Sequence, residues 1–251
     1  MKRREDHRRR IQRRYGGLVK GDTSSRTGEG GRFDPVEQAK CIGYTDAELS
    51  RVPAGAIMGM GCGNPTALAE LLPGETVLDI GCGGGLDAFL AADAVGKSGK
   101  VLGVDPTRQM VEKARENARS GDYGNVGFEQ GEVEHLPIGD DSVDVVISNC
   151  VINHCLDKLA VFREILRVLR PGGRMHIADL VTVGKFSQEA FDDRVWGAWL
   201  TAASDRQEYL DAIRKAGFRN ISVSSQGLFG AAEADQRLAG RIESIRVTAR
   251  K

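Results

Sequence analysis

Four residues at alternate positions could form a cradle for a nucleotide-like ligand: Asp79, Gly81, Gly83 and Gly85. They follow the apolar run 77–80 and precede the apolar segment 86–95, which predicts a strand, a tight turn and a helix. Glycine lacks the Cβ atom that would block a ligand, and it tolerates the backbone angles of such a turn. A plain strand-to-helix turn without a ligand is the alternative. Leu86 stands where a dinucleotide fingerprint beginning at Gly81 needs glycine or alanine, so that motif is not matched.

A carboxylate follows the next predicted strand. Asp105 comes directly after the apolar run 100–104, 20 residues after Gly85. An acidic residue at the tip of the second strand can accept hydrogen bonds from both hydroxyls of a ribose. Met110, in the helix that follows, is either a core residue or a contact for an adenine ring.

Polar and sulfur-bearing residues gather after the fourth predicted strand, 143–148: Asn149, Cys150, Asn153, His154 and Cys155. In an open α/β sheet, ligands bind beyond the carboxyl ends of the strands. We therefore expect Asn149 and Cys150 to face the ligand, with Asn153 beside a second substrate.

Strand and helix patterns alternate along most of the chain. A helix is expected over 157–169, residues 170–173 should stop it, and residues 221–225 and 244–249 should form a final antiparallel pair. This alternation predicts an α/β fold with a doubly wound, mainly parallel seven-stranded sheet. Its strands are expected at 77–80, 100–104, 126–130, 143–148, 174–180, 221–225 and 244–249.

Composition fits one enzyme-sized domain. The chain has 251 residues, 41% of them hydrophobic, and a net charge of zero, so no overall attraction to nucleic acid is expected. It has no apolar run of membrane length and no signal-peptide pattern, and its five cysteines are odd in number, which together predict a cytoplasmic protein with reduced thiols. Residues 1–40 form a basic extension, interpreted as a solvated helix and a mobile loop, and 41–251 form the main domain.

The glycine motif, with Asp105, resembles the first motifs of class I S-adenosylmethionine-dependent methyltransferases. This resemblance implies a Rossmann-like fold and S-adenosylmethionine as the cofactor. It also implies that Glu132 and Val133, after the third strand, flank the adenine. An N-terminal segment often folds over the cofactor in such enzymes, which makes Tyr15 a candidate contact.

Three further segments resemble arsenite methyltransferases: 60–67, 131–137 and 148–153. The likeness extends over about 42–180, with a fainter continuation at 208–210 and 216–218. Enzymes of that family place cysteines in an N-terminal loop, after the fourth strand and in the C-terminal half. Cys150 matches the middle position, residues 21–32 hold no cysteine, and the third position falls near Trp199.

Because two of the expected thiols are missing, the sequence favours methyl transfer to a small organic acceptor on this scaffold. Trp196 and Trp199, within the additions around 183–210, would then line the acceptor pocket. His154 would act as the general base for a hydroxyl or amine.

Two alternatives remain open. The first is a true arsenite methyltransferase that uses Cys150 with Cys155, and the second is an inactive cofactor-binding relative. Cys62 and Cys82 are expected to be buried and inert, and no bound metal is expected.

Overall fold

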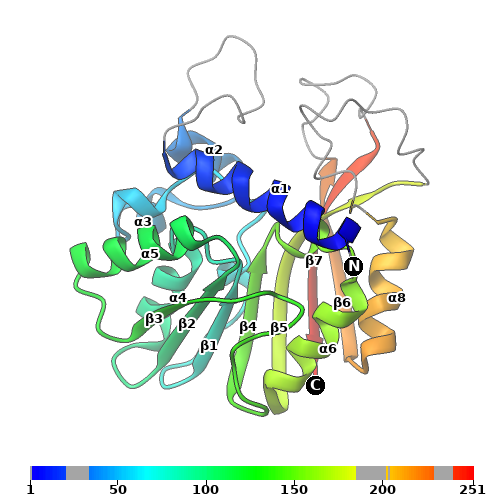
Figure 1. The fold of residues 1–251 in the computed structure, drawn as a ribbon. Helices are drawn as coiled ribbons and strands as arrows, with labels where there is room; N and C mark the ends of the chain where they lie inside the picture. The colour runs from blue at the N-terminus through cyan, green and yellow to red at the C-terminus, as the bar shows by residue number, and fades with distance from the viewer. Residues whose placement is uncertain (1, 21–33, 185–201, 203, 229–239) are drawn as a thin grey trace.

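A seven-stranded sheet forms the centre of the protein (Figure 1). The structure is a computed structural model that describes residues 2–20, 34–184, 202, 204–228 and 240–251. The strand order is β3-β2-β1-β4-β5-β7-β6, parallel from β3 to β5, with β7 antiparallel to both of its neighbours. The strands are β1 (Thr76–Ile80), β2 (Lys100–Asp105), β3 (Val126–Gln130), β4 (Val143–Asn149), β5 (Leu169–Thr182), β6 (Arg219–Leu228) and β7 (Ile242–Arg250). The predicted doubly wound sheet and its antiparallel final pair are confirmed.

Helices cover both faces of the sheet. Successive side chains of β1 point to opposite faces of the sheet and so belong to two different cores. Val77 packs in the core with α4 and α5, whereas Leu78 and Ile80 pack in the core with α6 and α8. No helix of the described ranges is both long and apolar enough to cross a membrane. The helices are α1 (Lys2–Val19), α2 (Pro35–Cys41), α3 (Asp46–Leu49), α4 (Leu86–Val95), α5 (Arg108–Ser120), α6 (Lys158–Val168) and α8 (Arg206–Ala216), with short 3₁₀ turns η2 (Ala54–Ala56), η3 (Thr66–Leu68) and η4 (Ile152–His154).

The boundary between α6 and β5 differs from the prediction. The side chain of Asp157 accepts a hydrogen bond from the Ala160 N–H and caps α6, which ends at Val168. Strand β5 begins at once, five residues before the predicted 174–180, and its pairing with β4 shifts register between Leu169 and Arg174. Pro171 has no N–H to donate and Gly172 has a φ of 82°, so residues 170–173 form a bulge within the strand β5.

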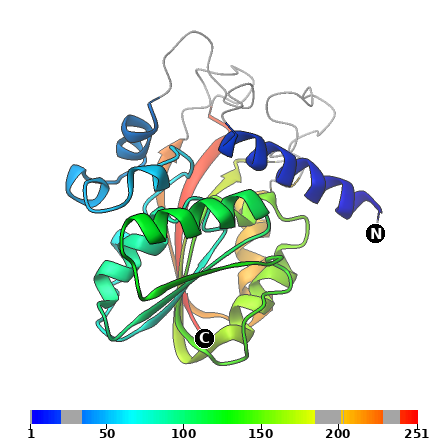
Figure 2. The same ribbon diagram turned by 60° about the vertical axis from the view of Figure 1, so that its left-hand side comes forward.

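The basic N-terminal segment is a helix that lies across the carboxyl ends of the parallel strands (Figures 1 and 2). The ring of His7 in α1 is buried, and its Nε2 lies 2.8 Å from the carbonyl oxygen of His154. Gln12 donates a hydrogen bond to the carbonyl of Pro106. One side of the predicted solvated helix is thus docked on the loops that follow β2 and β4, and the predicted mobile loop lies outside the described residues.

Arg174 on β5 holds the chain that leads into β1. Its guanidinium donates to the carbonyls of Ala69 and Glu70 and forms an ion pair with Glu75 at 2.6 Å. Both side chains of the pair are largely buried. This contact fixes the end of the segment that carries residues 57–65 across the top of the sheet.

Replacing Arg174 by leucine should leave the Glu75 carboxylate and two carbonyls without their donor. We expect the free energy of unfolding to fall by about 2–4 kcal/mol, measured by urea denaturation. The matched control is Arg214→Leu, which removes an exposed ion pair with Asp211 and should cost less than about 0.5 kcal/mol. Equal losses in the two variants would contradict a structural role for Arg174.

Candidate active site

The glycines after β1 have different roles. Gly81, Gly83 and Gly85 all have positive φ angles, of 73°, 52° and 97°. A Cβ on Gly81 would lie 2.2 Å from a methyl carbon of Val151, and one on Gly85 would lie 2.7 Å from the ring of Phe89. A Cβ on Gly83 would meet only the end of Met60, at 3.9 Å, so this is the backbone left open to a ligand. The glycine spacing therefore serves tight packing at two positions and ligand approach at one.

A large pocket opens above this loop, between the ends of the strands and α1. Its empty volume is about 1220 Å³, a figure that includes solvent space at the open mouth. Gly85 and Asp79, both predicted ligand contacts, do not line it. The predicted residues that do are Tyr15, Gly81, Gly83, Asp105, Met110, Glu132, Val133, Asn149, Cys150, His154 and Cys155.

Asp105 is placed to bind a ribose. One carboxylate oxygen accepts the Gly83 N–H at 3.0 Å and the other accepts the Thr107 N–H at 2.8 Å. A carboxylate has about four acceptor positions, so two remain for hydroxyl donors in the pocket. Burial raises the pKa of Asp105 to about 6, despite these two hydrogen bonds.

The predicted adenine contacts Met110, Glu132 and Val133 all line the pocket. Met110 and Val133 are both buried and supply an apolar surface. Glu132 and Glu134 lie 3.4 Å and 3.2 Å from the Arg8 guanidinium of α1, so the helix closes this side.

Acidic groups collect beneath the glycine loop. Burial, together with the carboxylates of Asp87 and Asp105, raises the pKa of Asp79 well above its usual range. One oxygen of Asp79 has no hydrogen-bond partner. Burial also raises the pKa of Asp87, which lines the pocket, to about 6. Such a cluster favours a positively charged ligand, since a cation relieves the repulsion among carboxylates.

Asn149 organises the site from the end of β4. Its side-chain oxygen accepts the Cys62 N–H at 3.0 Å, and its amide nitrogen lies 2.7 Å from the Gly63 carbonyl. The same nitrogen lies 2.9 Å from the Tyr44 hydroxyl and 3.2 Å from Asp87. Although Asn149 lines the pocket, its polar atoms bind the protein itself.

His154 does not suit the role of general base. Burial, aided by the neighbouring Arg14, His7 and Lys158 side chains, lowers the pKa of His154 to about 3. Its Nε2 lies 3.0 Å from the hydroxyl of Tyr15. The imidazole is therefore neutral and weakly basic at physiological pH, and its visible role is to anchor α1.

Cys150 and Cys155, the two thiols predicted to act together, have different surroundings. Cys150 is half-buried, lines the pocket and has a φ of 58°, an angle that non-glycine residues rarely adopt. Cys155 packs in the core around α6, where its thiol donates to the Val151 carbonyl. Burial, aided by Glu134, raises the pKa of Cys155 well above its usual range.

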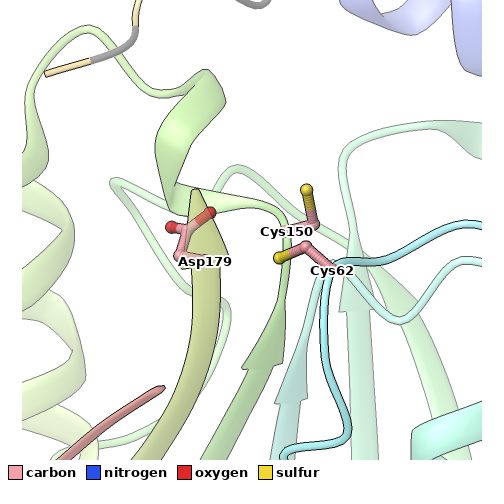
Figure 3. Close-up of side chains that lie close together, drawn as sticks. All are labelled: Cys62, Cys150 and Asp179. Carbon is pink, nitrogen blue, oxygen red and sulfur yellow. The ribbon is translucent and has the colours of Figure 1, made fainter. Parts of the chain in front are cut away.

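Cys62 is the thiol that lies beside Cys150. The sulfurs of Cys62 and Cys150 and a carboxylate oxygen of Asp179 all lie within 4.8 Å of one another, the one such cluster of potential metal-binding groups in the described ranges (Figure 3). They come from the loop before β1, the turn after β4 and the strand β5. Cys62 is buried, as expected, but it is not simply a core residue. The cluster that contains Cys150 therefore includes Cys62, and it does not include Cys155, the thiol predicted to act with Cys150.

Asn153 was expected to contact substrate, and this was wrong. The residue has 0% exposure and does not line the pocket. Its side-chain amide instead donates to the sulfur of Cys150 at 3.4 Å. Trp196 and Trp199 lie outside the described residues.

Sequence reasoning missed Asp87 and the role of Cys62. Cys62 lies inside segment 60–67, whose resemblance was recognised, so its position in that motif was the available signal. Asp87 is the first-turn acid of α4, and nothing in its spacing distinguishes it from a helix-capping charge.

The methyltransferase-domain family matches residues 71–217, and the sheet, the open glycine and the Asp105 carboxylate at the end of β2 agree with it. The chain belongs to the class I S-adenosylmethionine-dependent methyltransferases, and it is an enzyme of that class. Within this family it is similar to arsenite methyltransferases.

Two relatives carry that similarity. An arsenite methyltransferase of Halobacterium salinarum is 39% identical over 262 residues, which cover 98% of this chain and 67% of that protein. The structure of an arsenic(III) S-adenosylmethionine methyltransferase of Chlamydomonas reinhardtii matches with a TM-score of 0.62 and 31% identity, covering 88% of this chain and 74% of that one. The 27-O-demethylrifamycin SV methyltransferase of Amycolatopsis mediterranei is also similar, at 36% identity over 62% of this chain and 59% of that protein.

The residues present fit S-adenosylmethionine. Gly83 leaves room for backbone approach, Asp105 has free acceptor positions for the ribose, and Met110 with Val133 forms an apolar wall. The acidic cluster beneath the loop suits the cationic methionine end.

Replacing Asp105 by asparagine should weaken S-adenosylmethionine binding about 10- to 100-fold at pH 7.5, because charge-assisted bonds to the ribose are lost. Wild-type affinity should fall as the pH drops below about 6, since the bound hydroxyls favour the ionised carboxylate whose pKa in the free protein is about 6. Asp87 titrates in the same range, so the variant should lose only part of this pH dependence.

Isothermal titration at pH 5.0 and 7.5 measures both effects. Asp144→Asn, on a carboxylate that binds Arg170 and the Thr76 N–H at the other end of β4, is the matched control. Unchanged affinity in Asp105→Asn would refute the assignment.

Proposed function

We propose that this enzyme methylates trivalent arsenic held by Cys62 and Cys150. The proposal is carried by one observation: the two sulfurs come from distant segments and lie within 4.8 Å of one another and of an Asp179 carboxylate oxygen. Cys150 also lines the pocket that contains the glycine loop. The expected shortage of thiols no longer argues against arsenic, because Cys62 supplies the second one.

Soft trivalent arsenic prefers sulfur to oxygen ligands. Two thiols can replace two hydroxyls of arsenite, and the lone pair of the arsenic stays free as the nucleophile. Cys62 is fixed for this role at its backbone, because its N–H is bound by Asn149 and its carbonyl accepts the Ser244 hydroxyl at 2.7 Å.

The protonation of the site agrees with such an acceptor. S-adenosylmethionine supplies an electrophilic methyl group on its sulfonium. An arsenic lone pair needs no proton removed before it attacks, whereas a hydroxyl acceptor needs a general base. His154, one of the two histidines that line the pocket and the one predicted as general base, has a pKa lowered to about 3 and cannot act efficiently in that role.

The docked helix α1 contributes by shielding the reaction. His7, Ile11 and Tyr15 form part of the pocket wall opposite the strand ends. Covering the site keeps water from the reacting groups and strengthens the electrostatic interactions within it.

The similarity to the Halobacterium arsenite methyltransferase supports the same acceptor. An organic small molecule remains the second candidate, supported by the similarity to the rifamycin methyltransferase and by the apolar lining of the pocket. In either case we propose a cytoplasmic enzyme with a small-molecule substrate and no nucleic-acid or membrane partner. Thiol ligands need a reducing compartment.

Methyl transfer to arsenite, followed by chromatography and elemental mass spectrometry with a reducing thiol present, tests the proposal. Cys62→Ser and Cys150→Ser should each lower the rate by about 100-fold or more, since each removes a ligand, while S-adenosylmethionine affinity is retained. Cys155→Ser is the matched control and should stay within about three-fold of wild type, because its thiol is bound to the Val151 carbonyl and is not part of the cluster of Cys62, Cys150 and Asp179.

Full activity in Cys62→Ser would refute the dithiol site. A wild-type enzyme that binds the cofactor and ignores arsenite would favour the organic acceptor, and one that binds no cofactor would favour the inactive alternative.

A further inference from the structure

The two thiols of the site differ in their access to the pocket. Cys150 is half-buried and lines the pocket, whereas Cys62 has 2% exposure and lies behind the lining residues. Burial and the neighbouring Cys150 thiol raise the pKa of Cys62 well above its usual range. A molecule that enters the pocket therefore reaches the sulfur of Cys150 before that of Cys62.

A rigid donor lies against the sulfur of Cys150. The Asn153 side-chain amide donates to this sulfur, and the Asn153 backbone N–H donates to Asp179 at 2.9 Å. Asp179 also accepts the Tyr209 hydroxyl at 2.8 Å, so the turn η4 is bound through it to β5 and α8. Because these groups are all buried, the amide has little freedom to move away from the sulfur.

The backbone of Cys150 is also held in place by a hydrogen bond. Its N–H donates to the Ala178 carbonyl on β5 at 2.8 Å, although its φ of 58° is unfavourable for a residue with a side chain. Strained conformations of this kind persist where surrounding structure enforces them, and they concentrate at functional sites. In Figure 3 the Cys150 side chain points away from the strand ends, while the Cys62 sulfur points toward Asp179.

We propose that Asn153 is a positioning residue that holds Cys150 as the thiol that captures the acceptor first, with Cys62 closing the chelate second. An amide held within hydrogen-bonding distance fixes where the Cys150 sulfur lies, so the side chain stays at the pocket lining where an entering molecule meets it. As applied to arsenic, this inference rests on the proposed function.

The capture balances without an oxidant or reductant. The Cys150 sulfur forms a sulfur–arsenic bond with arsenite, one arsenic–oxygen bond breaks, and the thiol proton leaves with the hydroxide as water. The Cys62 sulfur then forms the second sulfur–arsenic bond. Its thiol proton departs with the second hydroxide as water, so the buried thiol needs no separate base.

Alkylation by iodoacetamide in the absence of arsenic and cofactor tests the order of the thiols. Mass spectrometry of the cysteine peptides gives each rate at pH 7. In the wild type, Cys150 should react faster than Cys62. Asn153→Leu has a similar shape without a donor, and it should slow Cys150 about five-fold, the loss of one ordinary hydrogen bond. Asn153→Asp, which also lacks the amide donor, should slow it as well.

The matched control is Asn125→Leu. The Asn125 amide binds the carbonyls of Ala92 and Gly96 at the far end of α4, so its loss should lower the melting temperature and leave the Cys150 rate unchanged. Thermal melts confirm that each variant is folded, and Asn153→Asp provides the test should the leucine variant not fold.

A Cys150 rate equal to wild type in a folded Asn153 variant would overturn the proposal, as would faster alkylation of Cys62. Because no arsenic is present, a slowed Cys150 in an enzyme that ignores arsenite would support the positioning role while the arsenic function failed.

Discussion

The side chain of Asn149 is the interaction on which the rest of the site depends. It lies at the end of β4 and binds the backbone on both sides of Cys62 through one amide group. The next residue along the chain is Cys150. The Asn149 side chain thus joins two segments 87 positions apart, and Asn149 directly precedes one of the two thiols. A Cβ on Gly61 would lie 2.9 Å from this amide, so the approach of the loop also requires a glycine there.

Local sequence patterns explain which parts of the molecule could be predicted. The strand, turn and helix around Gly81 depend on local periodicity and on residues that have few alternatives, and they were found where expected. Asp105 was found for the same reason, because the tip of a neighbouring parallel strand has a fixed place relative to the glycine loop. The helix expected over 157–169 does end at Val168, but the bulged start of β5 at 170–173 was not predicted, because proline and glycine mark helix ends and strand bulges alike.

The rest of the site depends on distances that no local pattern encodes. Cys62 precedes β1 and Cys150 follows β4, and their meeting results from the central position of those two strands and from a loop held by Arg174 and Asn149. His154 has the residue type of a base, but its burial against α1 removes its basicity. Asn153 has the residue type of a substrate ligand, but its amide faces the protein. In both cases the environment, which only the fold provides, reverses the role expected from the side chain.

The positive φ of Cys150 carries a consequence for how this site can change over time. Glycine would relax that backbone position and stabilise the fold by roughly 1 kcal/mol, the usual difference at a left-handed residue. Selection for stability alone would therefore tend to remove the cysteine. A cysteine at position 150 therefore costs the fold stability that the thiol must justify by its function, whereas Cys155 packs in the core without a positive φ.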